Sequence, residues 1–155
     1  CGEALGGLLG SPSRLVALDL HWNSLHGAGA HALLGGLYEN GAEGGGRLRR
    51  LDLAWNRLGG GSHVDPARRR DAHEAARLLA DTFRDGSVLF HLDISYNGFN
   101  ADDCAVLAGG LHSNHSLFGI HLIGNEATVD ALGFVIPLRR GLQQQQRQQQ
   151  RRRRR

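Results

Sequence analysis

Apolar residues recur along this chain in a pattern that appears four times. The shared pattern is L-x-x-L-x-L-x-x-N-x-L, and the copies occupy residues 15–25, 48–58, 89–99 and 117–127. The fourth copy is weaker, because it loses the last apolar residue. Within each copy the central apolar residues alternate with polar ones, which predicts a short strand with one buried face. The residues expected to face inward are Leu18, Leu20, Leu51, Leu53, Leu92, Ile94, Ile120 and Leu122.

The segments between these strands have helical spacing. Residues 27–40 and 101–113 each carry a one-sided apolar patch, and Asn100 is the expected N-cap of the second. Asp65 followed by Pro66 predicts a capped helix start, so a longer helix is expected over residues 66–84. Residues 1–10 match the helical half of a copy, and residues 128–138 begin like another helix that would stop at Pro137. The chain is therefore predicted to be α/β.

The four copies divide the chain into repeats. They start at residues 15, 48, 89 and 117, which are 33, 41 and 28 residues apart. Periods of this size indicate an array of structural repeats. The expected boundaries are a partial repeat at 1–14, repeats at 15–47, 48–88 and 89–116, and a partial or capping repeat at 117–138. Residues 139–155 form a Gln/Arg-rich tail, which is expected to be disordered because it has little apolar surface to bury.

The repeated pattern resembles the leucine-rich repeat, and the unit of about 28 residues is similar to the ribonuclease-inhibitor-like class. This resemblance implies a solenoid in the shape of a horseshoe arc, with short parallel strands on its concave side and helices on its convex side. It also implies a fragment of a longer array. The repeated asparagines would form a ladder that satisfies backbone groups of the turns; they are Asn23, Asn56, Asn97 and Asn125.

Charge divides the chain into two parts. Residues 1–138 contain ten Arg and all fifteen acidic residues, for a net charge of −5, whereas residues 139–155 contain eight Arg and no acid, for +8. The tail would attract RNA or acidic partners weakly through electrostatics, but no aromatic residue is interleaved to stack on bases. No apolar run is long enough for a transmembrane segment.

Two cysteines are too few for a disulfide framework, and the chain has no signal-type N-terminus. An intracellular, cytoplasmic location is therefore expected. Residues 93–134 also resemble the end of certain protist repeat proteins, some of which belong to motile cilia. A cilium-associated location is the alternative.

The exposed strand face carries the candidate partner-binding residues. Trp22, Trp55 and Tyr96 occupy equivalent positions at its rim, where they either pack along one another or contact a partner. A column of aspartates would favour a basic partner, although Leu-Asp-Leu is also common in this class. The aspartates are Asp19, Asp52 and Asp93, and the remaining candidates on this face are His21, Arg50, His91 and His121.

The triplet Arg68, Arg69 and Arg70 is a separate candidate patch for an acidic partner. Positive charge at a helix N-terminus opposes the helix dipole, so stability alone does not favour it. The other interpretation is a solvated helix end.

Candidate chemistry adds little to this picture. His91, Asp93, His121 and Asp52 are types that bind zinc, but they come from one open face and each has an explanation in the repeat. The glycine runs lack the Lys-Ser/Thr of a phosphate loop. We expect no catalytic residue, metal or cofactor, and predict a non-enzymatic protein–protein interaction or scaffold module that recognises a protein through its concave face. The alternatives are RNA or acidic-partner binding through the tail or, as the resemblance implies, a regulatory domain of a Ran-type GTPase-activating protein or nucleotide-binding receptor.

Overall fold

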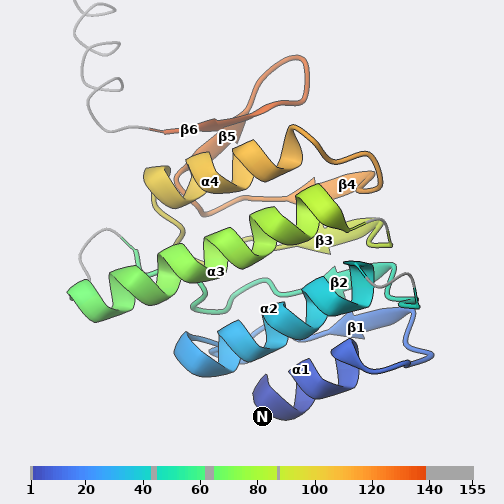
Figure 1. Cartoon of the computed structure of the whole chain (residues 1–155). Helices are drawn as coiled ribbons and strands as arrows, with labels where there is room; N and C mark the ends of the chain where they lie inside the picture. Colours follow the sequence, from blue (N-terminus) through green and yellow to red (C-terminus); the bar gives the residue numbers. More distant parts are fainter. Residues whose placement is uncertain (1, 43–44, 62–64, 87, 139–155) are drawn as a thin grey trace, which may run out of the picture.

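The computed structural model describes residues 2–42, 45–61, 65–86 and 88–138. Its elements alternate between helices and short strands until the last two strands (Figure 1). In chain order they are α1 (Gly2–Gly10), β1 (Ala17–Asp19), α2 (Gly27–Ala42), β2 (Arg50–Asp52), α3 (Pro66–Asp85), β3 (His91–Asp93), α4 (Ala101–Leu111), β4 (Gly119–His121), β5 (Ala127–Val129) and β6 (Val135–Pro137).

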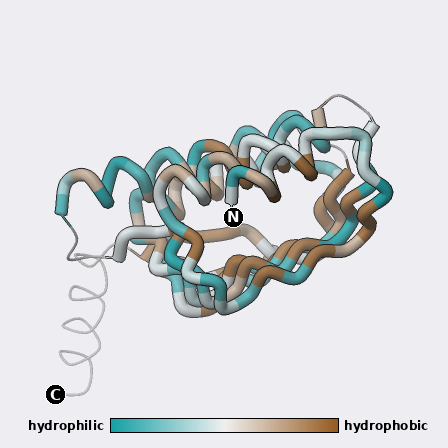
Figure 2. Tube along the Cα trace, turned by 90° about the horizontal axis from the view of Figure 1, so that it is seen from below, coloured by the Kyte–Doolittle hydropathy of each residue, from teal (hydrophilic) through white to brown (hydrophobic). Residues whose placement is uncertain are grey.

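The first four strands form one parallel sheet in the order β1-β2-β3-β4, so each strand pairs with the next one in the sequence. Their Cα register joins equivalent positions of the repeated pattern: Leu18 with Leu51, Leu51 with Leu92, and Leu92 with Ile120. All four helices lie on the same side of this sheet, and Figure 2 shows the helices and the strands as two layers. The chain is therefore mixed α/β, as predicted.

The core lies between the two layers. The inward residues of the inner strands, such as Leu53, Leu92 and Ile94, are fully buried. At the edge strands, Leu18, Leu20 and Ile120 are half-buried and pack against the same core, whereas Leu122 is buried. The alternation of apolar and polar residues thus predicted which side of each strand faces the helices.

The helix caps match their sequence signals. The Asp65 carboxylate accepts hydrogen bonds from the backbone N–H groups of Ala67 (2.9 Å) and Arg68 (3.0 Å). The Asn100 side chain accepts from Asp102 and Asp103, both at 2.9 Å. Each cap satisfies backbone donors that have no partner in the first turn of a helix. Both predicted N-termini are confirmed.

The prediction that residues 128–138 begin as a helix is wrong. This segment forms an antiparallel hairpin, in which β5 pairs with β6. Its β-branched residues favour a strand, and the Asp130 carboxylate accepts from the backbone N–H groups of Leu132 (2.8 Å) and Phe134 (2.9 Å) to close the turn. Gly133 supplies the positive φ that this turn requires.

The predicted disorder of residues 139–155 lies outside the described residues. Within the part of the chain that the structure describes, no helix is both long and apolar enough to cross a membrane.

Candidate functional site

The sheet face opposite the helices, called here the helix-free face, carries most of the predicted site residues. The strand register aligns them in two rows across β1 to β4. One row contains Ala17, Arg50, His91 and Gly119, and the other contains Asp19, Asp52, Asp93 and His121. A shallow hollow of about 350 Å³ lies over the strands and is lined by residues of both rows.

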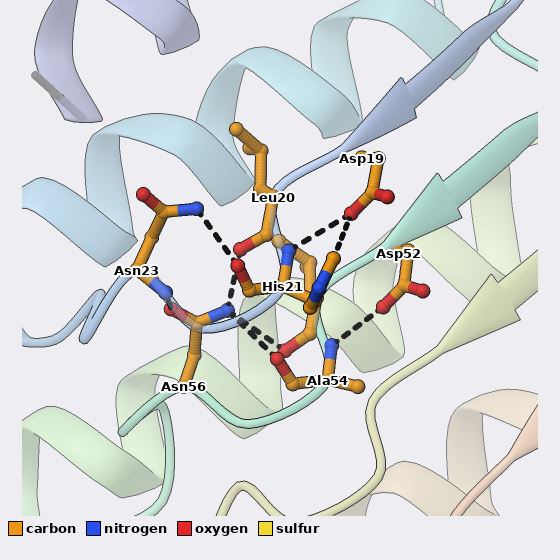
Figure 3. A network of polar contacts seen from close by, with 8 residues as sticks. Asp19, Leu20, His21, Asn23, Asp52, Ala54 and Asn56 are labelled. Carbon is orange, nitrogen blue, oxygen red and sulfur yellow. Dashed lines mark hydrogen bonds and ion pairs between the residues drawn. The ribbon is translucent and has the colours of Figure 1, made fainter.

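The three aspartates repeat one local hydrogen bond. Oδ1 of each accepts from the backbone N–H two residues later, at His21 (3.1 Å), Ala54 (2.9 Å) and Ser95 (2.8 Å). Figure 3 shows the first two of these bonds. The bond satisfies a backbone donor where the strand ends. The aspartate column therefore has a structural cause within each repeat, in addition to its charge.

His21 and Asp19 form an ion pair at the edge of this face (Figure 3). The His21 Nδ1 atom lies 2.6 Å from Asp19 Oδ1, and both side chains are exposed. The hydrogen bond to Asp19 raises the pKa of His21, and the charge of Asp52 raises it further. The same bond lowers the pKa of Asp19.

His91 and His121 meet across β3 and β4. Their Nε2 atoms lie 3.2 Å apart, and the two ring planes are tilted by 54°. The Nδ1 atom of His121 lies 4.0 Å from Asp93 Oδ2. Gly119 makes room for the His91 ring, since a Cβ at this position would approach His91 Cδ2 to 2.8 Å.

The predicted aromatic residues form a continuous stack along the rim. The ring centroids of Trp22 and Trp55 are 5.0 Å apart, and those of Trp55 and Tyr96 are 4.1 Å apart. All three side chains remain exposed, at 67%, 47% and 43%. Their φ angles are 59°, 56° and 53°, a left-handed conformation that bulky residues rarely adopt. Gly124 has φ 80° at the equivalent position of the fourth copy.

The asparagine ladder lies beneath this rim. Oδ1 of Asn56 accepts from the backbone N–H groups of Asn23 (3.1 Å) and Leu25 (2.9 Å), which belong to the preceding repeat. Its amide nitrogen donates to the carbonyl of Leu20, also in that repeat, at 2.9 Å. Asn97 and Asn125 repeat this geometry. The predicted structural role of the asparagines is therefore confirmed at three of the four positions.

The arginine triplet lies on the first turns of α3, in the helix layer, and the structure divides it between two hollows. Arg68 lines a hollow of about 350 Å³ that also includes Tyr96. Arg69 and Arg70 line a larger groove next to His73 and Asp103. Asp71, Glu74 and Asp102 line the same groove, so acidic side chains lie beside two of the three arginines.

Two features of the structure had not been predicted. Phe90 and Phe118 stack with centroids 5.2 Å apart and planes within 1° of parallel, and Phe118 is 84% exposed. Phe90 and Phe118 directly follow Leu89 and Leu117, the equivalent first leucines of two copies, and this equivalence in the sequence could have indicated the pair.

Asp103 is buried, and within the described residues its Oδ2 has no hydrogen-bond partner. Burial raises the pKa of this carboxyl.

Cys104 on α4 is fully buried, as its place on the apolar face of this helix predicts. Desolvation raises the pKa of its thiol to about 12. A thiol with so high a pKa is protonated near neutral pH and makes a poor nucleophile or metal ligand.

The structure redistributes the four residues that had been considered for zinc. His91, Asp93 and His121 do come together, as described above. Asp52 instead groups with Asp19 and His21, whose ligand atoms all lie within 4.8 Å of one another. That group is already joined by the ion pair and by the backbone bond to Ala54.

A scan of the chain against models of protein families finds no match, and a search of curated proteins also finds none.

Proposed function

We propose that this chain is a leucine-rich repeat module of the ribonuclease-inhibitor-like class that binds a protein partner across its helix-free face. In this proposal the repeats form a solenoid, the helix-free face is its concave side, and the module acts as a recognition or scaffold domain. The proposal is supported by strands that pair in sequence order and by asparagine amides that link each turn to the one before it.

The observation that carries the proposed function is the exposed stack of Trp22, Trp55 and Tyr96. Stacking alone does not require these rings to stay so exposed, and each occupies an unfavourable backbone conformation. Tryptophan and tyrosine are the types most enriched in binding hot spots, because they bury much area with little loss of side-chain entropy. A rigid row of exposed rings is therefore well suited to contact another protein.

Charge next to the stack favours a basic partner. Each ring follows an aspartate by three residues, from Asp19 to Trp22, from Asp52 to Trp55 and from Asp93 to Tyr96. One oxygen of each carboxylate accepts from the backbone, and the negative charge remains at the surface. Acidic groups around aromatic contacts steer basic partners and reject acidic ones.

The test is affinity capture from a cell lysate with the full chain as bait. The double variant Trp55→Ala with Tyr96→Ala is expected to lower the affinity for each captured partner by about 30-fold or more. The reason is that even one hot-spot side chain contributes about 2 kcal/mol or more to the binding free energy. Arg69→Ala with Arg70→Ala, on the helix layer, is the matched control and is expected to retain the partners.

A third bait separates the strand face from the tail. Replacing Arg151, Arg152, Arg153, Arg154 and Arg155 by Gln removes most of the basic charge of the tail and leaves the face unchanged. Partners that disappear with this bait and persist with the aromatic double variant would overturn the proposal in favour of binding through the tail.

A further inference from the structure

We propose that His91 and His121 bind a divalent transition-metal ion of the zinc and copper class between their Nε2 atoms. The site would lie at the β3–β4 side of the helix-free face. It does not depend on the proposed protein partner, since metal binding is measured on the chain alone.

The separation of the two nitrogen atoms suits a shared ion. In a tetrahedral site with Zn–N bonds of about 2.0–2.1 Å, neighbouring ligand atoms lie about 3.3 Å apart. The two Nε2 atoms lie 3.2 Å apart, so an ion needs little movement of either ring. Imidazole nitrogen suits zinc, copper and nickel, and water would complete the coordination.

The neighbour of His121 favours the tautomer that a metal requires. Asp93 Oδ2 lies 4.0 Å from His121 Nδ1. Its negative charge favours the proton on Nδ1, which leaves the lone pair of Nε2 available. The 4.0 Å separation is a charge interaction and is too long for a hydrogen bond; a carboxylate behind a metal-binding histidine commonly orients its ring.

The sheet itself holds the two rings together. His91 pairs in register with Gly119, and Asp93 pairs with His121, so both rings project from adjacent strands of a fixed sheet. The missing side chain at Gly119 lets the His91 ring extend toward His121, because a Cβ there would approach His91 Cδ2 to 2.8 Å. Glycine at position 119 therefore allows the close approach of the His91 and His121 rings.

One neighbour acts against a cation. Arg50 is the register partner of His91 on β2, and its positive charge repels a bound metal. Arg50→Gln is consequently expected to strengthen metal binding severalfold. A variant that gains affinity is informative, because a merely damaged protein would not show it.

The experiment is calorimetric titration of the full chain with zinc chloride, repeated with copper, in a buffer that does not chelate. His91→Gln and His121→Gln are each expected to weaken the metal at least tenfold. Asp93→Asn is expected to weaken it about tenfold, the usual range for a residue behind a ligand. Gly119→Ala, which retains both imidazoles, is expected to weaken it severalfold.

Three further measurements make the outcome decisive. His112→Gln with His115→Gln removes two histidines that lie three residues apart at and after the C-terminal end of α4, and the metal is expected to remain. The imidazole proton signals of His91 and His121 should shift together on titration, and far-UV circular dichroism should confirm that each variant is folded.

The proposal is overturned if zinc and copper at millimolar concentration fail to bind the wild-type chain, or if the His91 and His121 variants bind as well as wild type. It is also overturned if His21→Gln abolishes binding while those two variants retain it. That result would assign the metal to Asp19, His21 and Asp52, the other group of potential ligands on this face.

Discussion

The edge strand β1 and the inner strands β2 and β3 carry the same sequence pattern. Equivalent residues of the pattern nevertheless contribute differently to stability in the two regions. Asn56 and Asn97 are buried and link their own turn to the preceding one. Asn23 is exposed and donates a single side-chain bond, to the carbonyl of His21. Leu92 is fully buried, whereas Leu18 is half-buried. In the described structure, the role of a repeated residue depends on a neighbouring repeat that packs against it.

The largest expected effect compares Leu92→Ala with Leu18→Ala. Leu92 lies fully buried between β3 and the helix layer, so its truncation should cost about 2–5 kcal/mol of unfolding free energy. The half-buried Leu18 loses less packing, and its truncation should cost about 1 kcal/mol. Urea unfolding followed by circular dichroism measures both. Equal losses would show that the edge strand is packed as firmly as the inner ones.

A smaller difference is expected between Asn97→Ala and Asn23→Ala. The Asn97 amide donates to the carbonyls of Leu53 (2.8 Å) and Ile94 (3.1 Å), and its Oδ1 accepts from Leu58. Removing it takes the acceptor from the Leu58 N–H and one of two amide donors from each carbonyl, which keep Asn56 and Asn125, at a cost of about 2 kcal/mol. Asn23→Ala should cost less than about 1 kcal/mol, because the single bond it loses is exposed. The same urea experiment tests this pair, and a large loss at Asn23 would contradict the ladder model.

The smallest expected effect is electrostatic and concerns the edge strand. Asp19→Asn should lower the pKa of His21, because the hydrogen bond to Asp19 is the main cause of its elevation. Asp52→Asn should lower it less, since Asp52 acts on His21 through its charge alone. Titration of the His21 ring protons by NMR measures both values. If the two variants shift the pKa equally, the ion pair is not the dominant interaction.

The sign of the pH dependence follows from the same pair. His21 has a raised pKa when folded, so its contribution to stability is full below its unfolded pKa and is lost as pH rises through the folded value. Asp19 has a lowered pKa, so its contribution is lost as pH falls through that folded value. The attraction between His21 and Asp19 is therefore greatest at pH values between their two folded-state pKa values. High salt should weaken it, because both side chains are exposed.

Features that depend on local spacing were predictable. The alternation around Leu51 and Leu53 defined a strand and its buried side. Asp65 with Pro66, and Asn100, marked two helix starts. The hairpin after β4 was mispredicted, because its apolar residues fit either a helix or a strand and the Asp130 turn chemistry was overlooked.

The sequence by itself determined the positions of the strands and helices before residue 127, the inward side of each strand, and the rows into which Trp22, Asp19 and their equivalents fall. These follow from periods of two or nearly four residues, which need no knowledge of distant contacts. Only the tertiary structure decided that the aromatic rings stack, that His91 and His121 bring two nitrogen atoms within 3.2 Å, and that Asn23 is exposed while Asn97 is buried. Those facts depend on how one repeat lies against the next, at separations of about 30 to 40 residues, and the repeated pattern is the same in each copy whether or not a neighbour covers it.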